Sequence, residues 1–190
     1  MAKKRKNRWV VPNGQPITEL DKRILEYQDK GILVPTRDLI KTPEQIEGIR
    51  KAGIINTAAL DLAEQHIKVG MTTAELDKMI HDFIISKGAI PACLGYEGFP
   101  KSCCISINEV VCHGIPSDEE EFFEGDIVNV DITTILDGYY ADASRMFIVG
   151  QTSPECEKLV KVAKECLEIG MEVAKPWGFV GEIGKAIEKH

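Results

Sequence analysis

Two aspartates, Asp131 and Asp142, lie inside a stretch that otherwise has the composition of strands, IVNVDITTILDGYYADASRMF (127–147). Aspartate is usually depleted in strands. Between the two, Asp137-Gly138 is a strong signal for a two-residue hairpin loop. Counting outward from that loop sets Thr133 opposite Asp142 and puts Asp131 on the same face, diagonal to Asp142. The sequence therefore predicts two carboxylates that approach each other on one face of a hairpin.

Two carboxylates so placed repel each other, and each raises the pKa of the other unless a cation sits between them. A divalent metal ion, or a pair of ions, would remove the repulsion, and carboxylate oxygens are suitable ligands. The alternative is that both aspartates cap turns or face solvent on the outer side of the hairpin. The residues alone leave both interpretations open.

A histidine, His113, lies in NEVVCHGIP (108–116), where His113-Gly114 and Ile115-Pro116 predict a sharp turn. Histidine serves as acid, base or metal ligand, but a single histidine more often has a structural role than a catalytic one. The acidic run SDEEEFFEGD (117–126) that follows is interpreted as a solvated loop.

Two helices are predicted ahead of these strands. The first begins at Pro43, with Thr42 and Gln45 as a capping box, and we expect its core face to consist of Ile46, Ile49, Ile54, Ala58 and Leu62. The second has its box at Thr72 and Glu75 and a stop at Gly88. The segments 101–108 and 127–136 are expected to be strands.

Two more helical patterns follow the hairpin. One begins at Ser153-Pro154 and ends before Lys175-Pro176, with a predicted buried stripe of Leu159, Val162, Ala163, Cys166, Leu167 and Ile169. The other covers 181–190 and stops at His190 without a capping residue, which predicts that the chain ends inside a domain.

Composition indicates a globular chain, since 44% of its 190 residues are hydrophobic and 28% are charged. No apolar run is long enough to span a bilayer, so we expect no membrane partner. The net charge of −7 argues against nucleic acid as the main partner of the folded body. Six cysteines without a CxxC pair are expected to be free thiols in a reducing cytoplasm.

The chain is predicted to divide into an N-terminal extension, 1–41, and a domain, 42–190. The extension carries turn signals at Pro12-Asn13-Gly14, a short helical pattern in 17–28, and a basic start formed by Lys3, Lys4, Arg5, Lys6 and Arg8. Basic termini are usually solvated tails. A contact with ribosomal RNA is the functional alternative.

The segments PACLGYEGFPKSCCISINEVVCHGIP (91–116) and GDIVNVDITTILDGYYADASRMF (125–147) closely resemble the type I methionine aminopeptidases, and the likeness runs from Thr42 to His190. The resemblance implies the α+β pita-bread metallopeptidase fold, an antiparallel sheet with helices on one side. It implies removal of the initiator methionine from nascent polypeptides by metal-assisted hydrolysis, in the cytoplasm, by a protein that is monomeric at full length. Two divalent ions, of Co, Mn, Fe, Zn or Ni, would be the cofactors.

The resemblance also implies roles for individual residues. Asp131 and Asp142 would bind the metals, with Asp142 bridging them, and His113 would be catalytic, beside the scissile bond, where it hydrogen-bonds the substrate. The side chains expected to line the methionine pocket are Cys93, Tyr96, Phe99 and Cys104. Phe99 stands where a tyrosine is common, and Glu97 where bacterial members commonly have a histidine.

The family completes its site with two further histidines and two glutamates, which the resemblance implies lie beyond residue 190. We therefore expect the 190-residue chain alone to be inactive and marginally stable. Two alternatives stay open at this point: a non-catalytic binding protein of the pita-bread fold, and a proline-directed peptidase of that fold.

Overall fold

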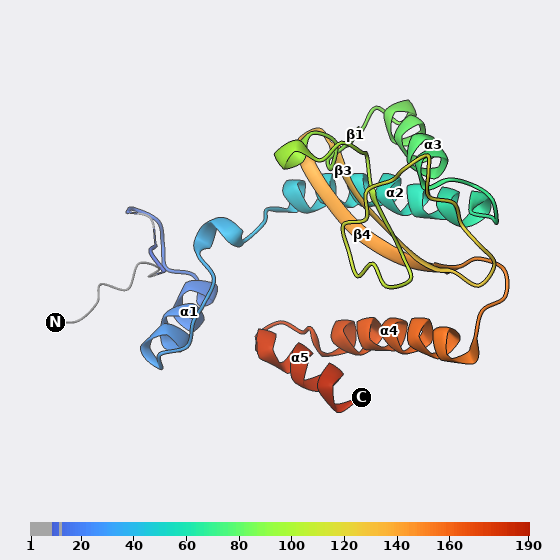
Figure 1. Ribbon diagram of the computed structural model, residues 1–190. Coiled ribbons are helices and arrows are strands. Elements are labelled where there is room, and N and C mark those ends of the chain that lie inside the picture. Colours follow the sequence, from blue (N-terminus) through green and yellow to red (C-terminus); the bar gives the residue numbers. More distant parts are fainter. Residues whose placement is uncertain (1–8, 12) are drawn as a thin grey trace. The chain divides into compact units, whose positions relative to one another are not determined.

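The structure is a computed structural model that describes residues 9–11 and 13–190 (Figure 1). The basic start at residues 3–8 and the first residue of the turn signal, Pro12, lie outside the described residues. Contacts divide the chain into two compact units, Met1–Glu47 and Gly48–His190. The border falls inside a helix, α2 (Pro43–His66), and the domain boundary after residue 41 stays a prediction.

The first unit is organised around one buried carboxylate. Helix α1 (Glu19–Asp29) starts with a capping box in which Thr18 and Asp21 bond reciprocally, and a 3₁₀ turn, η1 (Arg37–Leu39), follows. The Trp9 indole N–H (2.8 Å) and the Arg37 guanidinium (2.7 Å) both donate to Asp21 Oδ1, and the guanidinium also lies over the Trp9 ring. Asp21 is completely buried, so it is a fully satisfied charge at the centre of this small unit.

The second unit is built on a long hairpin. Strands β3 (Ile127–Leu136) and β4 (Tyr139–Ile148) pair antiparallel over their whole length. The loop between them is Asp137 and Gly138, both with positive φ (50° and 81°), as a type I′ turn requires. The predicted hairpin and its register, with Thr133 opposite Asp142, are confirmed.

Two short strands share the other edge of β3. Strand β1 (Ile90–Pro91) pairs with the end of β3 at residues 134–135, and β2 (Cys104–Ile107) pairs with residues 128–131. The loop 92–103, which contains the 3₁₀ turn η2 (Tyr96–Gly98), joins them. The two strands are therefore arranged end to end, with a gap opposite residues 132 and 133 of β3.

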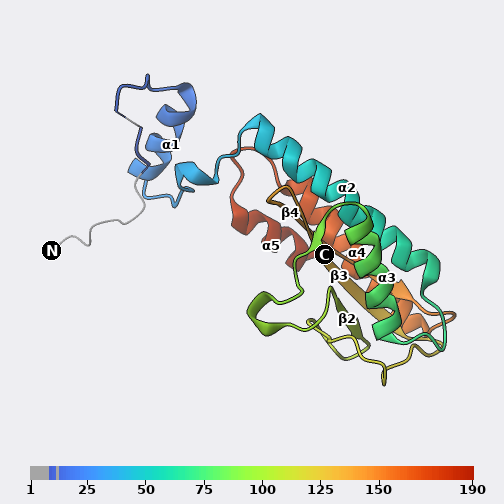
Figure 2. The ribbon, with the colours of Figure 1, turned by 90° about the horizontal axis from the view of Figure 1, so that it is seen from above.

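Helices α2 and α3 (Thr73–Ser86) cover one face of this sheet (Figures 1 and 2). The capping boxes predicted at Thr42 and Thr72 are present. The core between these helices and the sheet includes Leu60, Leu76, Ile80, Ile84, Ile105, Val128, Val130 and Ile132. Alternate residues of β3 enter this core, so Asp131 and Thr133 lie on the opposite face of the sheet.

The core face predicted for α2 is wrong. Ile46, Ile49 and Ile54 are exposed, whereas Ala52, Ala59 and Ala63 are fully buried. The reason is close approach: a Cβ on Gly48 would lie 2.4 Å from Cδ2 of Tyr139, so the small-residue side of α2 faces the hairpin. The small residues of α2 therefore pack against the hairpin together with Leu60, and Ile46, Ile49 and Ile54 lie outside.

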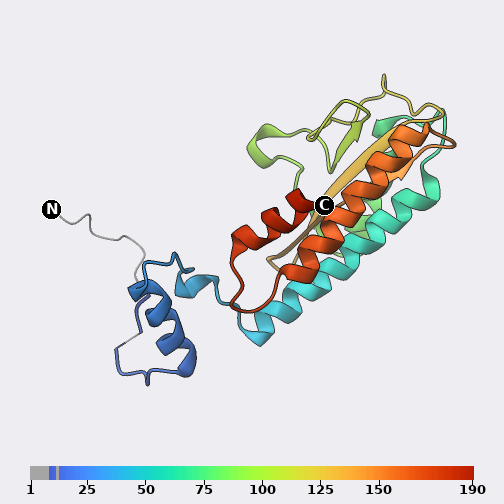
Figure 3. The same ribbon diagram turned by 90° about the horizontal axis from the view of Figure 1, so that it is seen from below.

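Helices α4 (Pro154–Val173) and α5 (Val180–Lys189) contact each other as a pair (Figure 3). The stripe predicted to be buried on α4 is also wrong, because Leu159 and Leu167 are each 60% exposed and Ala163 is exposed. The start at Ser153 and the end before Lys175-Pro176 agree with the sequence pattern. Helix α4 thus has an amphipathic surface whose larger apolar residues remain open.

None of the helices in the described part of the chain is both long and apolar enough to cross a bilayer.

The first unit yields a test of pH dependence. Hydrogen bonds from Thr18, then from Trp9, and the nearby Arg37 lower the pKa of Asp21 from 3.8 to about 2. Since the folded pKa is depressed, the stabilisation is complete above pH 3.8 and is lost as the pH falls through 2. In a Trp177→Phe background, where Trp9 is the only tryptophan, we expect its fluorescence to be constant above about pH 4 and to shift to that of exposed tryptophan below it.

The Asp21→Asn substitution in the same background removes the charge and should expose Trp9 already at pH 7. Glu19→Gln, on the exposed side of α1, is the matched control. An unchanged Trp9 emission in Asp21→Asn would mean that Asp21 does not hold this unit together.

Candidate active site

The two aspartates lie side by side on the face of the sheet away from the α2–α3 core. Asp131 on β3 pairs with Ser144 on β4, and Asp142 on β4 pairs with Thr133 on β3. Asp131 and Asp142 are thus diagonal neighbours, and their carboxyl groups lie close enough to interact. The Thr133 hydroxyl donates to Asp142 Oδ1 (2.8 Å) and fixes the orientation of that carboxylate.

The electrostatics of this pair are unfavourable for two charges. Burial, and next the Asp142 charge, raise the pKa of Asp131, while His113 opposes the shift. His113 therefore lies close enough to Asp131 to stabilise its ionised form. Two neighbouring carboxylates whose charges disfavour each other form the arrangement expected of a cation site.

The backbone of His113 is held in an unusual conformation by its neighbours. Its φ is +59°, in the left-handed region that histidine seldom adopts. The next residue, Gly114, accepts a hydrogen bond from the Ile105 N–H (3.0 Å) and donates one to Ser106 Oγ (3.1 Å). A Cβ on Gly114 would lie 2.0 Å from the Ile105 oxygen, so only glycine fits here. Strand β2 thus positions the His113 loop.

Two of the expected pocket residues, Cys93 and Cys104, lie close to each other, and their side chains interact. Burial, with Cys93 and Asp131 nearby, raises the pKa of Cys104 to about 12, so Cys104 is a neutral thiol. Cys104 is directly opposite Asp131 in the sheet. The pocket cysteines and the aspartates are therefore contiguous.

The two aromatic pocket residues lie on the loop 92–103, which turns tightly. The Gly95 N–H donates to the Phe99 oxygen (2.8 Å), and the Tyr96 N–H donates to the Cys93 oxygen (3.1 Å). Tyr96 is 68% exposed and Phe99 is half-buried. The structure brings Asp131, Asp142, His113, Cys93 and Cys104 together, whereas the ring of Tyr96 faces largely to solvent.

Three supporting residues were not identified from the sequence as part of the site: Thr133, Ser106 and Asp77. The buried Asp77 on α3 accepts hydrogen bonds from the N–H groups of Ser102 (2.8 Å) and Cys103 (3.1 Å), and so holds the entrance to β2. An aspartate beside Leu76 on the apolar side of a predicted helix was the available signal. Ser106 and Thr133 carry no such signal, because hydroxyl residues are common in strands.

Asp131 and Asp142 could hold a divalent metal ion, although they cannot complete its coordination. Among residues 9–11 and 13–190, no group of three or more His, Cys, Asp or Glu side chains converges to hold a metal. Hard divalent cations prefer carboxylate oxygens and take about six ligands. The pair fits as one part of a coordination set.

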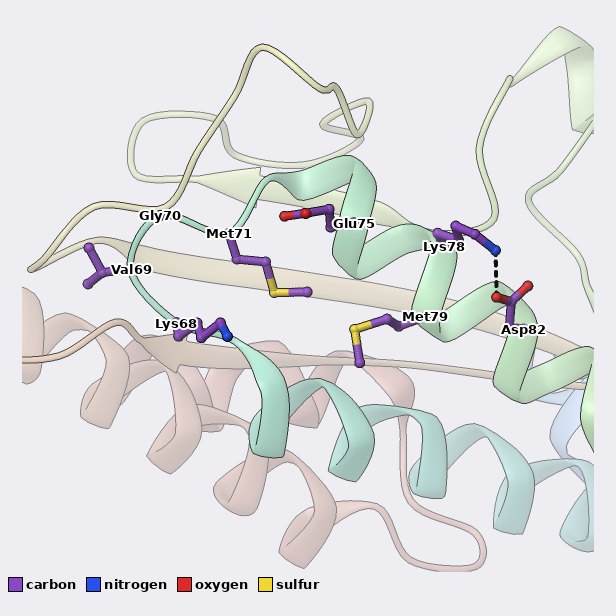
Figure 4. A pocket seen from close by; sticks show the side chains of 8 residues that line it. All are labelled: Lys68, Val69, Gly70, Met71, Glu75, Lys78, Met79 and Asp82. Atoms are coloured by element: carbon purple, nitrogen blue, oxygen red, sulfur yellow. Dashed lines mark hydrogen bonds and ion pairs between the residues drawn. The ribbon is translucent and has the colours of Figure 1, made fainter.

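Two hollows border the second unit. A groove of about 800 Å³ runs between α2 and β4 and reaches Asp142, with Ile49, Ile54 and Tyr140 in its wall. Another hollow, of about 570 Å³, lies at the α2–α3 connection and contains the Lys78–Asp82 ion pair (Figure 4). The second contains no predicted site residue, whereas the first adjoins Asp142.

The model of metallopeptidase family M24 matches residues 47–190. The chain is 48% identical over 151 residues to methionine aminopeptidase of Escherichia coli K12, covering 79% of this chain and 57% of that protein. It is 51% identical over 146 residues to methionine aminopeptidase A of Synechocystis, covering 77% of this chain and 58% of that protein. The chain thus spans less than two thirds of the length of these curated relatives.

Comparison with solved structures gives the same family. The crystal structure of methionine aminopeptidase from Rickettsia prowazekii superposes with a TM-score of 0.77 at 45% identity, over 79% of this chain and 60% of that one. Prolidase from Pyrococcus furiosus superposes with a TM-score of 0.68 at 22% identity, over 88% of this chain and 50% of that one. The likeness to prolidase shows the fold alone. The predicted pita-bread fold and the predicted family are confirmed.

The carboxylate pair predicts that removing one carboxylate stabilises the metal-free protein and weakens metal binding. Asp131→Asn removes one of two repelling carboxylates. We therefore expect the free energy of unfolding of the metal-free variant to exceed that of the native chain by less than about 1 kcal/mol, and its unfolding temperature to be higher. Added Mn²⁺ should raise the unfolding temperature of the native chain and leave that of the variant unchanged. Differential scanning fluorimetry with and without Mn²⁺ measures both effects.

The control is Asp118→Asn, an exposed loop carboxylate, which should behave as the native chain. A metal-free Asp131→Asn variant less stable than native would show that Asp131 serves the fold rather than a cation.

Proposed function

We propose that this chain, which belongs to metallopeptidase family M24, forms part of a methionine aminopeptidase that removes the initiator methionine from nascent polypeptides. One observation carries the proposal: two carboxylates share one sheet face, beside a histidine and a pair of thiols. The identity of 48% to 51% with named methionine aminopeptidases supports it. Because the chain spans 57% to 58% of those relatives, the activity is proposed for the complete protein.

Asp131 and Asp142 would hold the divalent metal ions, and the Thr133 hydroxyl bonds one oxygen of Asp142, which leaves the other oxygen available as a ligand. Metal ions in such a site polarise the scissile carbonyl and make bound water acidic enough to attack at neutral pH. Two ions, of Co, Mn, Fe, Zn or Ni, are proposed. The aspartates are acceptors only, so substrate orientation depends on donors elsewhere.

His113 would supply such a donor. It is exposed, and its backbone is held in a strained turn that Gly114 anchors to β2, so the point from which the ring extends is fixed. A histidine N–H at the scissile bond can hydrogen-bond the substrate oxygen and strengthen that bond as negative charge develops.

The methionine side chain would be bound by Cys93 and Cys104 together with Tyr96 and Phe99. Sulfur and aromatic edges form favourable contacts with a thioether. The neutral thiol of Cys104 suits an apolar ligand, because a thiolate there would face both the ligand and Asp131. We propose that the exposed ring of Tyr96 turns inward when substrate binds.

The proposal is tested with the complete protein that carries residues 1–190. It should release methionine from Met-Ala-Ser when Mn²⁺ or Co²⁺ is added, and faster than it cleaves a Xaa-Pro peptide. Asp142→Asn should lower kcat/KM at least about 100-fold and His113→Ala about 100- to 1,000-fold, mainly through kcat. Asp82→Asn, whose side chain pairs with Lys78 on the surface, is the control and should keep native rates.

The 190-residue chain by itself should be inactive, because two carboxylates leave most metal positions to water. Faster cleavage of the proline peptide would replace this proposal with a proline-directed peptidase. Failure of the complete protein to bind Mn²⁺, Fe²⁺ or Co²⁺ would replace it with a non-catalytic binding protein.

We also propose that the extension brings the enzyme to its substrate at the ribosome, in the cytoplasm, and that the complete protein is a monomer. Residues 1–41 contain ten Lys and Arg against five Asp and Glu, whereas residues 42–190 contain 13 against 25. Positive charge concentrated at one end of an acidic protein supports contact with RNA phosphates.

Deletion of residues 1–9 should weaken ribosome co-sedimentation and reduce its dependence on salt. A matched chain with Lys3, Lys4, Arg5, Lys6 and Arg8 replaced by glutamine separates charge from length. Co-sedimentation that is unaffected by either change would exclude this role.

A further inference from the structure

Four of the six cysteines gather around the gap between β1 and β2. Cys93 lies just beyond β1, Cys103 and Cys104 lie at the entrance to β2, and Cys112 lies in the His113 loop. All six cysteines of the chain are free thiols. Within the described ranges, 9–11 and 13–190, no group of three or more His, Cys, Asp or Glu side chains could hold a metal, so a thiolate metal cluster does not explain this gathering.

The sheet register places two of these cysteines close together along the same edge of β3. The Ala92 N–H donates to the Thr133 oxygen (2.8 Å), and Cys93 is the next residue, so its backbone lies near Thr133. Cys104 pairs with Asp131 on the same edge of β3. At about 3.3 Å of rise per residue, the two positions are separated by roughly 3 to 7 Å along β3. Disulfides need a Cα separation of about 4.4 to 6.8 Å.

The side chains also select this pair. The Cys93 side chain lies close enough to Cys104 to raise the pKa of its thiol by direct contact and by charge, whereas Cys112 raises that pKa by charge alone. Cys103 is completely buried on the core face, where its thiol donates to Asp77 Oδ1 (3.4 Å). Cys156 and Cys166 lie on α4. Cys93 is half-buried and Cys104 is buried, so an oxidant from solvent meets Cys93 first.

We propose that Cys93 and Cys104 form a reversible disulfide when the protein meets peroxide, and that this bond closes the methionine pocket. The peroxide O–O bond breaks as an S–O bond forms on Cys93, and one water leaves. The Cys104 sulfur then attacks the Cys93 sulfur, the S–S bond forms, and the oxygen departs as a second water with the Cys104 proton. Two thiols are oxidised by two electrons, and one peroxide is reduced.

The consequence for binding rests on the proposed function, since both thiols belong to the proposed methionine pocket. A disulfide would tie the loop 92–103 to β2 and remove the two separate sulfur contacts with the substrate thioether. The same loop carries Tyr96 and Phe99, so its aromatic edges would be restrained as well. Because cytoplasmic disulfides are usually transient, the bond would be reversed by cellular thiols.

Treatment of the reduced chain with hydrogen peroxide, followed by intact mass and peptide mapping, tests the bond without any assay of activity. We expect loss of two hydrogens, one linked peptide that joins Cys93 to Cys104, and full reversal by dithiothreitol. Cys93→Ser and Cys104→Ser should each prevent the link, and Cys156→Ser should form it as the native chain does. Oxygen added to Cys93 without a crosslink, or a link to Cys112, would overturn the proposal.

The effect on the pocket is measured on the complete protein. Peroxide should lower kcat/KM for Met-Ala-Ser at least about tenfold, dithiothreitol should restore it, and the Cys93→Ser variant should lack the reversible loss. Full activity of the disulfide form would contradict the proposal that the disulfide closes the pocket. A complete protein that is inactive even when reduced would instead contradict the proposed function, and the mass experiment would still decide whether the disulfide exists.

Discussion

The two-residue turn at Asp137 and Gly138 is the constraint on which the rest of the second unit depends. Its positive φ values fix which residues of β3 and β4 face each other, and a shift of one residue would turn Asp131 into the core. The same register sets where β1 and β2 attach along the free edge of β3. The spacing of the carboxylates and the position of the thiols therefore follow from one local feature of the sequence.

Buried hydrogen bonds carry this register outward to the loops of the site. Asp77 holds the start of β2, Ser106 holds the turn after His113, and the Thr134 hydroxyl donates to Asn56 on α2 (2.8 Å). Each link joins a loop or helix to a strand through a polar group that is buried, where an unmatched partner is costly. The candidate site thus combines strand residues with two loops, and the positions of these loops are set by the sheet and by α3.

The sequence predicted the parts of the fold that depend on local chemistry. Capping boxes, the hairpin turn and its register are determined by neighbouring residues, and they were identified correctly at Thr42, Thr72 and Asp137-Gly138. The core faces of α2 and α4 depend on what lies opposite, and both predictions failed. Ile49 and Ile54 suggested a core face. The close approach of Gly48 to Tyr139 instead turns the side of α2 that carries small residues toward the hairpin. The charged residues of the candidate site, Asp131 and Asp142, were identified from the sequence. The hydroxyl residues that support it, Ser106 and Thr133, were not.

The end-to-end placement of β1 and β2 also has a consequence for the order of folding. The β3–β4 hairpin closes a two-residue loop, whereas pairing β2 and β1 with β3 requires closing loops of about 20 and about 40 residues, at a higher cost in chain entropy. The hairpin is thus expected to form first, with both carboxylates still in water, where their repulsion is weak. Repulsion grows only as the later loops dock and exclude solvent, so it speeds the detachment of those loops and leaves the hairpin itself intact.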